Sequence, residues 1–189
     1  MHGKVCLVTG ATAGIGKEIA QGLAKLGATV AIVGKDKGKC EIALQETKSG
    51  SYFLADLSSQ AEVRRVADEF LSRYDRLDVL VNNAGVFLEK KKLTVDDIEY
   101  TFAVNHLAPF LLTNLLIDRL KKSTPSRVVT TSSSAHRAGS IDFDDIQFER
   151  RHYSGISAYS QSKLANILFT RELARRLAGT QVTANCFHP

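Results

Sequence analysis

Cysteine is scarce in this chain, and its pattern argues against a disulfide-stabilised protein. The three cysteines, Cys6, Cys40 and Cys186, are odd in number and form no C-x-x-C pair. Small secreted domains held by disulfides carry an even set of cysteines instead. Cys6 and Cys186 lie in apolar, strand-like runs, so we expect buried, free thiols in a reducing compartment.

Long apolar runs are also missing. No such run reaches the ~18 residues that a membrane-spanning helix requires. The first residues, Met1 to Lys4, lead directly into a strand-like run and contain neither the charged nor the apolar region of a signal peptide. We therefore expect no membrane span and a cytoplasmic location.

The net charge of +5 and the pI of about 9.2 do not by themselves indicate nucleic-acid binding. The basic residues are scattered in small groups among acidic ones, and no aromatic stacking pattern accompanies them. We expect no nucleic-acid partner. Solvated surfaces and attraction to a phosphorylated small molecule account for the charge.

Three aspartates and one histidine resemble functional residues, but each has a simpler interpretation. Asp142, Asp144 and Asp145 resemble a metal site, but the glycine and glutamate of a calcium loop are absent, so we expect solvated carboxylates and no metal. No Asp or Glu stands at a sequence spacing from His136 that would indicate a catalytic pair. We interpret it as a surface or loop-packing histidine.

Short apolar runs alternate with helical periodicity along all 189 residues, a length that suits one domain with a sizeable core. This alternation, with right-handed crossovers, predicts an α/β fold: a doubly wound parallel sheet of the Rossmann type, with at least six strands and helices on both faces. The predicted strands are 5–9, 29–33, 52–55, 77–81, 127–131 and 181–187. The predicted helices are 14–26, one through 41–44, one capped by Ser58, 94–120 with Pro109 inside it, and 157–177, and 135–153 is an irregular loop.

Three glycines follow the first predicted strand and open the first predicted helix. Small residues let the backbone approach a pyrophosphate closely, and a helix N-terminus offers free N–H groups and a partial positive charge. The spacing is G-x-x-x-G-x-G rather than G-x-G-x-x-G. We expect the whole turn to bind a dinucleotide: Gly10, Ala11, Thr12, Ala13, Gly14, Ile15 and Gly16.

Tyr159 and Lys163 stand four residues apart on a predicted helix and therefore share one face. A free tyrosine has a pKa of about 10 and is a poor acid or base near neutrality. A fixed ammonium group nearby favours the phenolate. Such a pair can transfer a proton at cellular pH.

These motifs, in this order, resemble the short-chain dehydrogenase/reductase family. Asn82-Asn83-Ala84-Gly85 resembles the family's N-N-A-G segment, and Asp56 resembles its adenine-contacting aspartate. The resemblance runs from Lys4 to the last residue. It implies cofactor contacts from Asp56, Leu57, Asn83, Ala84 and Gly85, and it places Asn105, Ser133, Tyr159 and Lys163 where the family has its four catalytic residues.

Three further segments resemble the retinol dehydrogenase-like branch of the family, with WW-domain oxidoreductases and protochlorophyllide reductases also similar. They are residues 132–136 (S-S-S-A-H), 162–166 (S-K-L-A-N) and 168–173 (L-F-T-R-E-L), with a long insert before Tyr159. This narrows the ancestry of the chain without naming a substrate.

The end of the second strand bears on the choice of cofactor. A carboxylate there would hold the ribose of NAD and repel the 2′-phosphate of NADP. The position corresponds to Gly34, followed by Lys35, which favours NADP because a cation attracts a phosphate. Asp36 is the alternative, because a shift of one residue would place its carboxylate against the ribose. NAD is therefore the less favoured cofactor.

The resemblance implies a role for each catalytic position. Ser133 binds the substrate oxygen, with Ser132 as its rival, and Tyr159 donates or accepts the proton. Lys163 assists the tyrosine and binds the nicotinamide ribose. Asn105 interrupts its helix and holds a water that returns the lysine's proton.

We therefore expect an NADP-dependent oxidoreductase acting on a carbonyl or alcohol, with a lipophilic, retinal-like compound as one candidate substrate. The alternative is a nucleotide-binding regulatory protein or non-catalytic fragment. The chain stops at His188-Pro189, directly after a predicted core strand, so we expect residues 1–189 to be one NAD(P)-binding domain truncated at its C-terminus. The family resemblance also implies a homodimer or homotetramer formed through helices 94–120 and 157–177.

Overall fold

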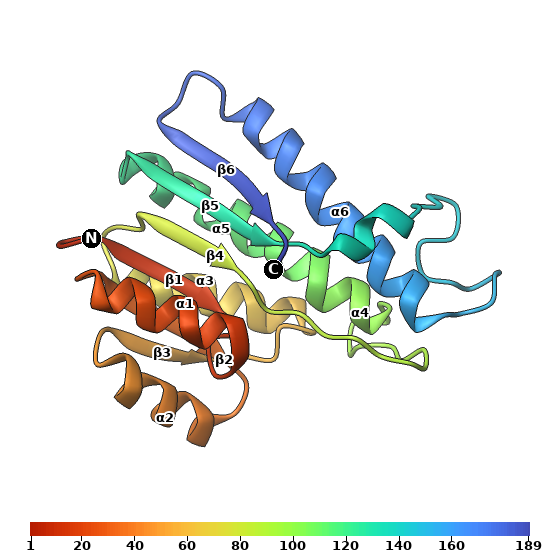
Figure 1. Ribbon diagram of the computed structural model, residues 1–189, viewed down its shortest axis with the longest axis horizontal. Coiled ribbons are helices and arrows are strands. Elements are labelled where there is room, and N and C mark those ends of the chain that lie inside the picture. Colours follow the sequence, from red (N-terminus) through yellow and green to blue (C-terminus); the bar gives the residue numbers. More distant parts are fainter.

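Six parallel strands form one sheet in the computed structural model, which describes residues 1–189 (Figure 1). The strand order is β3-β2-β1-β4-β5-β6. The strands are β1 (Val5–Thr9), β2 (Thr29–Gly34), β3 (Ser51–Leu54), β4 (Val79–Asn82), β5 (Ser126–Thr131) and β6 (Val182–Phe187). The helices are α1 (Gly14–Lys25), α2 (Lys37–Thr47), α3 (Gln60–Arg73), α4 (Tyr100–Phe102), α5 (Ala108–Lys122) and α6 (Gly155–Arg176), with a π-helical turn at Ala103–Leu107 and a 3₁₀ helix at Ser134–Ala138.

Helices cover both faces of the sheet, because successive strand residues point to opposite sides. Val5 and Leu7 of β1 belong to a core shared with α3, α5 and α6. Cys6 and Val8 of the same strand belong to a second core, shared with α1 and α2. The predicted doubly wound α/β sheet is confirmed.

All three cysteines are free, as expected. Cys6 and Cys40 are buried, and burial raises the pKa of the Cys6 thiol to about 12. Cys186 is only half-buried, because its strand, β6, lies at the edge of the sheet.

The strand order reverses between β1 and β4. From β1 the chain moves outward to β2 and β3, and from β4 it moves the other way to β5 and β6. The loops that leave the carboxyl ends of β1 and β4 therefore diverge and leave a crevice between them, which is where open α/β sheets bind their ligands.

Three helices begin at other residues than the sequence pattern predicts, and of these α6 begins at Gly155 instead of residue 157. The cap of α3 is Ser59, whose hydroxyl accepts from the N–H of Glu62, and the predicted cap at Ser58 is wrong. The Ser58 N–H instead donates to the Asp56 carboxylate at 2.9 Å. A turn of chain therefore lies between Asp56 and the start of α3.

The helix predicted from residue 94 begins only at Tyr100. Leu93 and Glu99 form an antiparallel bridge before it. The buried Glu99 carboxylate then caps the helix by accepting from the N–H groups of Thr101 and Phe102 at 2.9 and 2.7 Å. Apolar periodicity alone placed the start too early, because Val95 and Ile98 continue the helical spacing of the apolar residues that follow.

The continuous helical segment Tyr100–Lys122 is long and apolar enough, by length and composition, to cross a membrane, contrary to the expectation that no such segment exists. Of its most apolar window, 56% is buried inside the molecule. Leu112, Leu116 and Leu120 pack against the sheet, as in the core helix of a globular protein.

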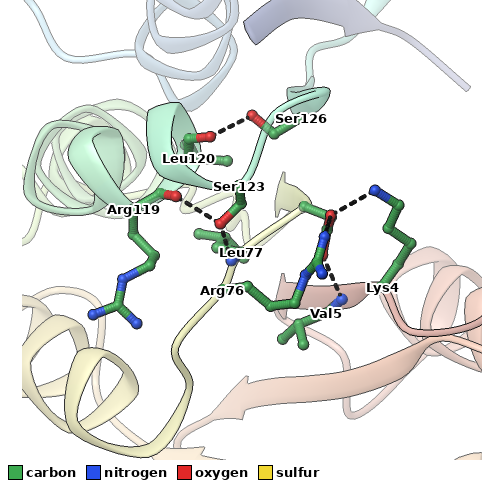
Figure 2. Close-up of polar contacts among 9 residues, drawn as sticks. Lys4, Val5, Arg76, Leu77, Arg119, Leu120, Ser123 and Ser126 are labelled. Atoms are coloured by element: carbon green, nitrogen blue, oxygen red, sulfur yellow. Dashed lines mark hydrogen bonds and ion pairs between the residues drawn. The ribbon is translucent and has the colours of Figure 1, made fainter. Parts of the chain in front are cut away.

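A polar cluster joins the amino ends of the central strands (Figure 2). The buried Asp78 carboxylate accepts hydrogen bonds from Lys4 Nζ, the Val5 N–H and the Arg76 guanidinium at 2.6 to 2.9 Å. Burial by itself would raise the pKa of Asp78, but the hydrogen bonds from Arg76, Lys4 and Val5 outweigh it and lower the pKa. The cluster ties β1 to β4 at the end of the sheet opposite the crevice.

Candidate active site

A cavity of about 590 Å³ opens at the carboxyl ends of β1 to β5, at the reversal of strand order. It brings together most of the residues that the sequence singled out. The predicted residues that line it are Gly10, Thr12, Ala13, Ile15, Gly16, Lys35, Asp56, Leu57, Asn83, Ala84, Gly85, Ser133, Tyr159 and Lys163. The predicted residues outside the lining are Ala11, which is buried behind the turn, Gly14, which is exposed, and Asn105, which is buried behind Gly85 and Val86.

The glycine turn packs directly on the N-N-A-G segment. Gly10 has a φ of 66°, and a Cβ on it would lie 2.8 Å from the Ala84 Cα. A Cβ on Gly16 would collide with the Gly10 carbonyl and the Asn83 side chain. No side chain caps the N-terminus of α1, so its first N–H groups face the cavity end of the helix without a side-chain acceptor. Such a turn leaves room for a phosphate group.

Thr9, which the sequence pattern does not reveal, holds the two loops together. Its hydroxyl accepts from the N–H groups of Asn83 and Ala84 at 3.0 and 3.1 Å. The Asn83 side chain donates back to the Thr9 carbonyl at 3.2 Å, and its oxygen accepts from Thr131. Asn82, by contrast, points away and donates to Thr113 of α5.

The end of β2 presents a lysine to the cavity. Lys35 lines it, whereas the Asp36 carboxylate caps α2 by accepting from the Lys39 N–H at 2.8 Å. A Cβ on Gly34 would lie 2.6 Å from Thr12 Cγ2 and 2.7 Å from Cys40 Sγ, so no larger side chain fits there.

Asp56 lines the same cavity as Lys35, close enough for the two charges to interact. Burial would raise the pKa of Asp56, but hydrogen bonds from Ser58 and the nearby charges of Lys35 and Lys92 together lower it. The carboxylate is therefore held in its charged form beside two cations.

Tyr159 and Lys163 lie together on α6, at the base of the cavity. The Lys163 ammonium is 5.4 Å from the centroid of the Tyr159 ring and donates to the Thr131 carbonyl at 3.2 Å. The lysine is 3% exposed, and burial lowers its pKa to about 8. Its proton therefore leaves more easily than that of a surface lysine.

Ser132 and Ser133 have different partners, although both touch the cavity. The Ser132 hydroxyl donates to the Lys163 carbonyl at 2.9 Å and so is engaged with the backbone of α6. The Ser133 hydroxyl accepts only a long hydrogen bond, 3.3 Å, from the Ala135 N–H. Its own proton is available to a ligand.

Asn105 was predicted to interrupt its helix, and it lies in the π-helical turn. Its Oδ1 accepts from the Val86 N–H at 2.7 Å, and its Nδ2 donates to the Val86 carbonyl at 2.9 Å and to Ser162 Oγ at 3.0 Å. The side chain is fully buried and supports the loop that lines the cavity from behind.

Phe87 is the main cavity residue that the motifs did not indicate. Its ring meets the Tyr159 ring edge-on, with centroids 5.8 Å apart, and it is 48% exposed. Its position two residues after Gly85 was the available signal. The sequence analysis weighed two further lining residues, Gly34 and Ser132, without assigning them to the site. The other unpredicted lining residues are Val33, Ala55, Val86, Tyr100, Val104, Thr131 and Pro189.

The loop predicted at 135–153 is irregular only from residue 139, because Ser134–Ala138 form a 3₁₀ helix. Within it, Asp145 is not solvated. Asp145 is buried and accepts from the N–H groups of Glu149 and Arg151 at 2.6 and 3.0 Å. The Arg151 guanidinium also donates to Gln161 of α6 at 2.8 Å. The expectation failed because these partners come from the fold of the insert itself.

His136 is not part of the cavity lining. Its Nδ1 lies 2.6 Å from the Ser133 carbonyl, and its ring is 6.4 Å from that of His188. This agrees with the interpretation of His136 as a loop-packing residue.

Comparison with known proteins agrees with this geometry. Residues 4–189 match the short chain dehydrogenase family. Human retinol dehydrogenase 13 is 46% identical over 99% of this chain, and mouse retinol dehydrogenase 12 is 49% identical over the same share. The chain spans only 58% and 61% of these two relatives.

A solved structure of another short chain dehydrogenase has a similar fold. The short chain dehydrogenase of Burkholderia cenocepacia, crystallised with NADP, is 32% identical and superimposes with a TM-score of 0.82, over 100% of this chain and 74% of that one. The chain belongs to the short-chain dehydrogenase/reductase family, in its retinol dehydrogenase-like branch.

Proposed function

We propose that this chain carries the cofactor site and the proton-transfer residues of an NADP-dependent oxidoreductase acting on a carbonyl or alcohol. The observation that carries the proposal is the buried Lys163 ammonium beside Tyr159, in the same cavity as the glycine turn. Because the chain spans 58% of human retinol dehydrogenase 13, the activity of the whole protein is part of the proposal.

The residues present fit a dinucleotide. The glycines at which a Cβ would collide, Gly10, Gly16 and Gly34, allow the close loop packing around the turn. A glycine turn of this kind lets the backbone approach a diphosphate closely. Asp56 and Asn83 supply polar groups on the rim, and the free N-terminus of α1 favours a phosphate. A bound nicotinamide would supply or accept the hydride.

The protein's own groups manage the proton and the oxygen. In reduction, the Tyr159 hydroxyl gives its proton to the substrate oxygen, and in oxidation the phenolate takes it back. The Lys163 ammonium stabilises that phenolate. The Ser133 hydroxyl donates to the substrate oxygen and stabilises the charge that develops there.

The preference for NADP over NAD rests on Lys35. A lysine at the cavity edge attracts a 2′-phosphate, while the Asp36 carboxylate is engaged as a helix cap instead of facing a ribose. The NADP complex of the Burkholderia cenocepacia relative supports the same cofactor class.

Replacing Tyr159 with Phe tests the chemistry, because it keeps the ring and removes the oxygen that carries the proton. We expect turnover to fall about 10²- to 10⁴-fold with NADPH binding nearly unchanged. Tyr52→Phe is the matched control, because the Tyr52 hydroxyl contacts only Glu41 at the surface. Unchanged turnover in Tyr159→Phe would contradict the assignment. Binding of NADPH by the wild type without any turnover would favour a nucleotide-binding regulatory protein.

The substrate is proposed only as a class. The names of the retinol dehydrogenase relatives and the exposed Phe87 ring beside Tyr159 support a lipophilic carbonyl or alcohol. A turnover panel of retinal, aliphatic aldehydes and steroid ketones tests this. We also propose a cytoplasmic homodimer or homotetramer, which cell fractionation and light scattering would check.

A further inference from the structure

The carbonyl of Asn105 lies where the helical hydrogen-bond pattern breaks. In a regular α-helix it would accept from the N–H of residue 109, and residue 109 is a proline, which has no N–H. The chain instead forms the π-helical turn Ala103–Leu107, closed by a bond from the Ala108 N–H to the Ala103 carbonyl.

Asn166, from the neighbouring helix α6, supplies a donor to this carbonyl. Its Nδ2 donates to Asn105 O at 2.8 Å, and its Oδ1 lies 3.1 Å from Nδ1 of His106. Asn166 is 1% exposed, so both contacts are shielded from water.

His106 completes the contact. Since Asn166 Oδ1 can only accept, the pairing assigns a hydrogen to Nδ1 of His106. Burial lowers the pKa of His106, which agrees with a neutral ring. The Asn166 side chain of α6 therefore contacts two successive residues of the π turn, Asn105 and His106.

The orientation of this turn decides where the Asn105 side chain points. Asn105 makes a reciprocal pair of hydrogen bonds with the Val86 backbone, and Val86 lines the cavity. A return to regular helix would rotate Asn105 about the helix axis and break that pair, because each residue's direction depends on the turn's repeat.

We propose that Asn166 is a positioning residue: it replaces the hydrogen bond that Pro109 removes, holds the π turn, and so keeps Asn105 against Val86. Its effect on catalysis rests on the function proposed above. Its effect on the Val86 backbone does not.

Amide hydrogen exchange at Val86 in the full chain tests this directly, because the Val86 N–H donates to Asn105 Oδ1. Asn166→Ala should speed exchange at Val86 about tenfold, the effect of losing one buried hydrogen bond, and leave Leu80 of β4 nearly unchanged. Asn114→Ala is the matched control, because the exposed Asn114 also donates to a carbonyl of α5, that of Phe110, outside the π turn.

Two further variants keep the test decisive. Asn166→Asp keeps the size and the acceptor but loses the donor, so it should act like Asn166→Ala even where the alanine variant folds poorly. Pro109→Ala restores an N–H at residue 109 and so permits the regular helix. The double variant with Asn166→Ala should therefore exchange at Val86 at least as fast as Asn166→Ala alone. No acceleration, equal acceleration at Leu80, or recovery of the Val86 protection in the double variant would overturn the proposal.

Turnover provides the second readout. Asn166→Ala should lower kcat several-fold with the KM for NADPH unchanged, and adding Pro109→Ala should not restore it. If the wild type has no turnover, the proposed function fails, whereas the Val86 exchange still decides whether Asn166 holds the turn.

Discussion

Lys163 Nζ and Asn105 Oδ1 lie on the same side of Gly85, each 3.4 Å from the position that a Cβ on that glycine would take. Because Gly85 has no side chain, the buried ammonium and the buried amide both approach its backbone from that side. The π turn and α6, which carry the two groups, also contact each other directly through the bond from Asn105 to Ser162.

Ser133 and Ser132 should respond differently to removal of their hydroxyl groups. Ser133→Ala should lower kcat about 10²- to 10³-fold, the usual effect of losing one donor to a developing oxyanion, without changing stability. Ser132→Ala should lower the free energy of unfolding by about 1 kcal/mol, because it loses the bond to the Lys163 carbonyl. Steady-state kinetics and urea unfolding of both variants separate the two. The reverse pattern would exchange their roles.

Lys35→Glu should reverse the proposed preference for NADP. A carboxylate at this edge repels a 2′-phosphate and can hold a ribose hydroxyl. We expect NADPH to bind at least about tenfold more weakly and NADH to bind equally or better, as measured by nicotinamide fluorescence. Lys39→Glu, one turn further along and exposed, is the control for net charge. An equal loss for both cofactors would argue against a role for Lys35 in selection.

Lys163 should cost the free protein stability at neutral pH. Its pKa of about 8 in the folded state lies below the ordinary 10.5, so between these values the unfolded chain binds more protons. Stability from this group therefore rises as pH increases from 8 to 10.5. Lys163→Met should be more stable than the wild type at pH 7 by about 1–3 kcal/mol, and the gain should shrink by pH 10. Denaturant unfolding at both pH values measures it. A pH-independent difference would contradict the buried charge.

Asp78 should do the opposite. Its pKa is lowered in the folded state, so its contribution is present above the ordinary value of 3.8 and is lost as pH falls through the folded pKa. Asp78→Asn should lower the free energy of unfolding at pH 7 by about 1–3 kcal/mol. In strong acid the two proteins should converge. Asp75→Asn, just outside β4 and without a hydrogen bond in this cluster, is the control. A difference that persists in acid would exclude an electrostatic origin.

The fold was predictable because its strands are continuous apolar runs. The runs that became β1 and β5 were placed within one residue of their observed bounds, since buried parallel strands leave a signal in a few adjacent residues. The start of the helix at Tyr100 was not predictable in this way, because it depends on the unusual burial of the Glu99 carboxylate as a cap.

The candidate site divides along the same line. Motif residues such as Gly10, Tyr159 and Lys163 meet in one cavity, because each follows directly from a strand end or a helix face. Asn166 gave no signal, because its partner Asn105 lies 61 residues away in the chain. Asp145 was misjudged for a related reason: its burial follows from the path of an irregular loop.

The position of the Asp78 cluster bears on how the protein can be immobilised on a surface. Met1, Lys4 and Asp78 border one groove at the amino ends of the strands, and Figure 1 shows the N-terminus at that end, away from the loops of the candidate site. A tag or surface linker joined at Met1 would leave the cofactor cavity facing solution. Immobilised chains could therefore be titrated with nucleotides on a sensor chip without blocking the entrance.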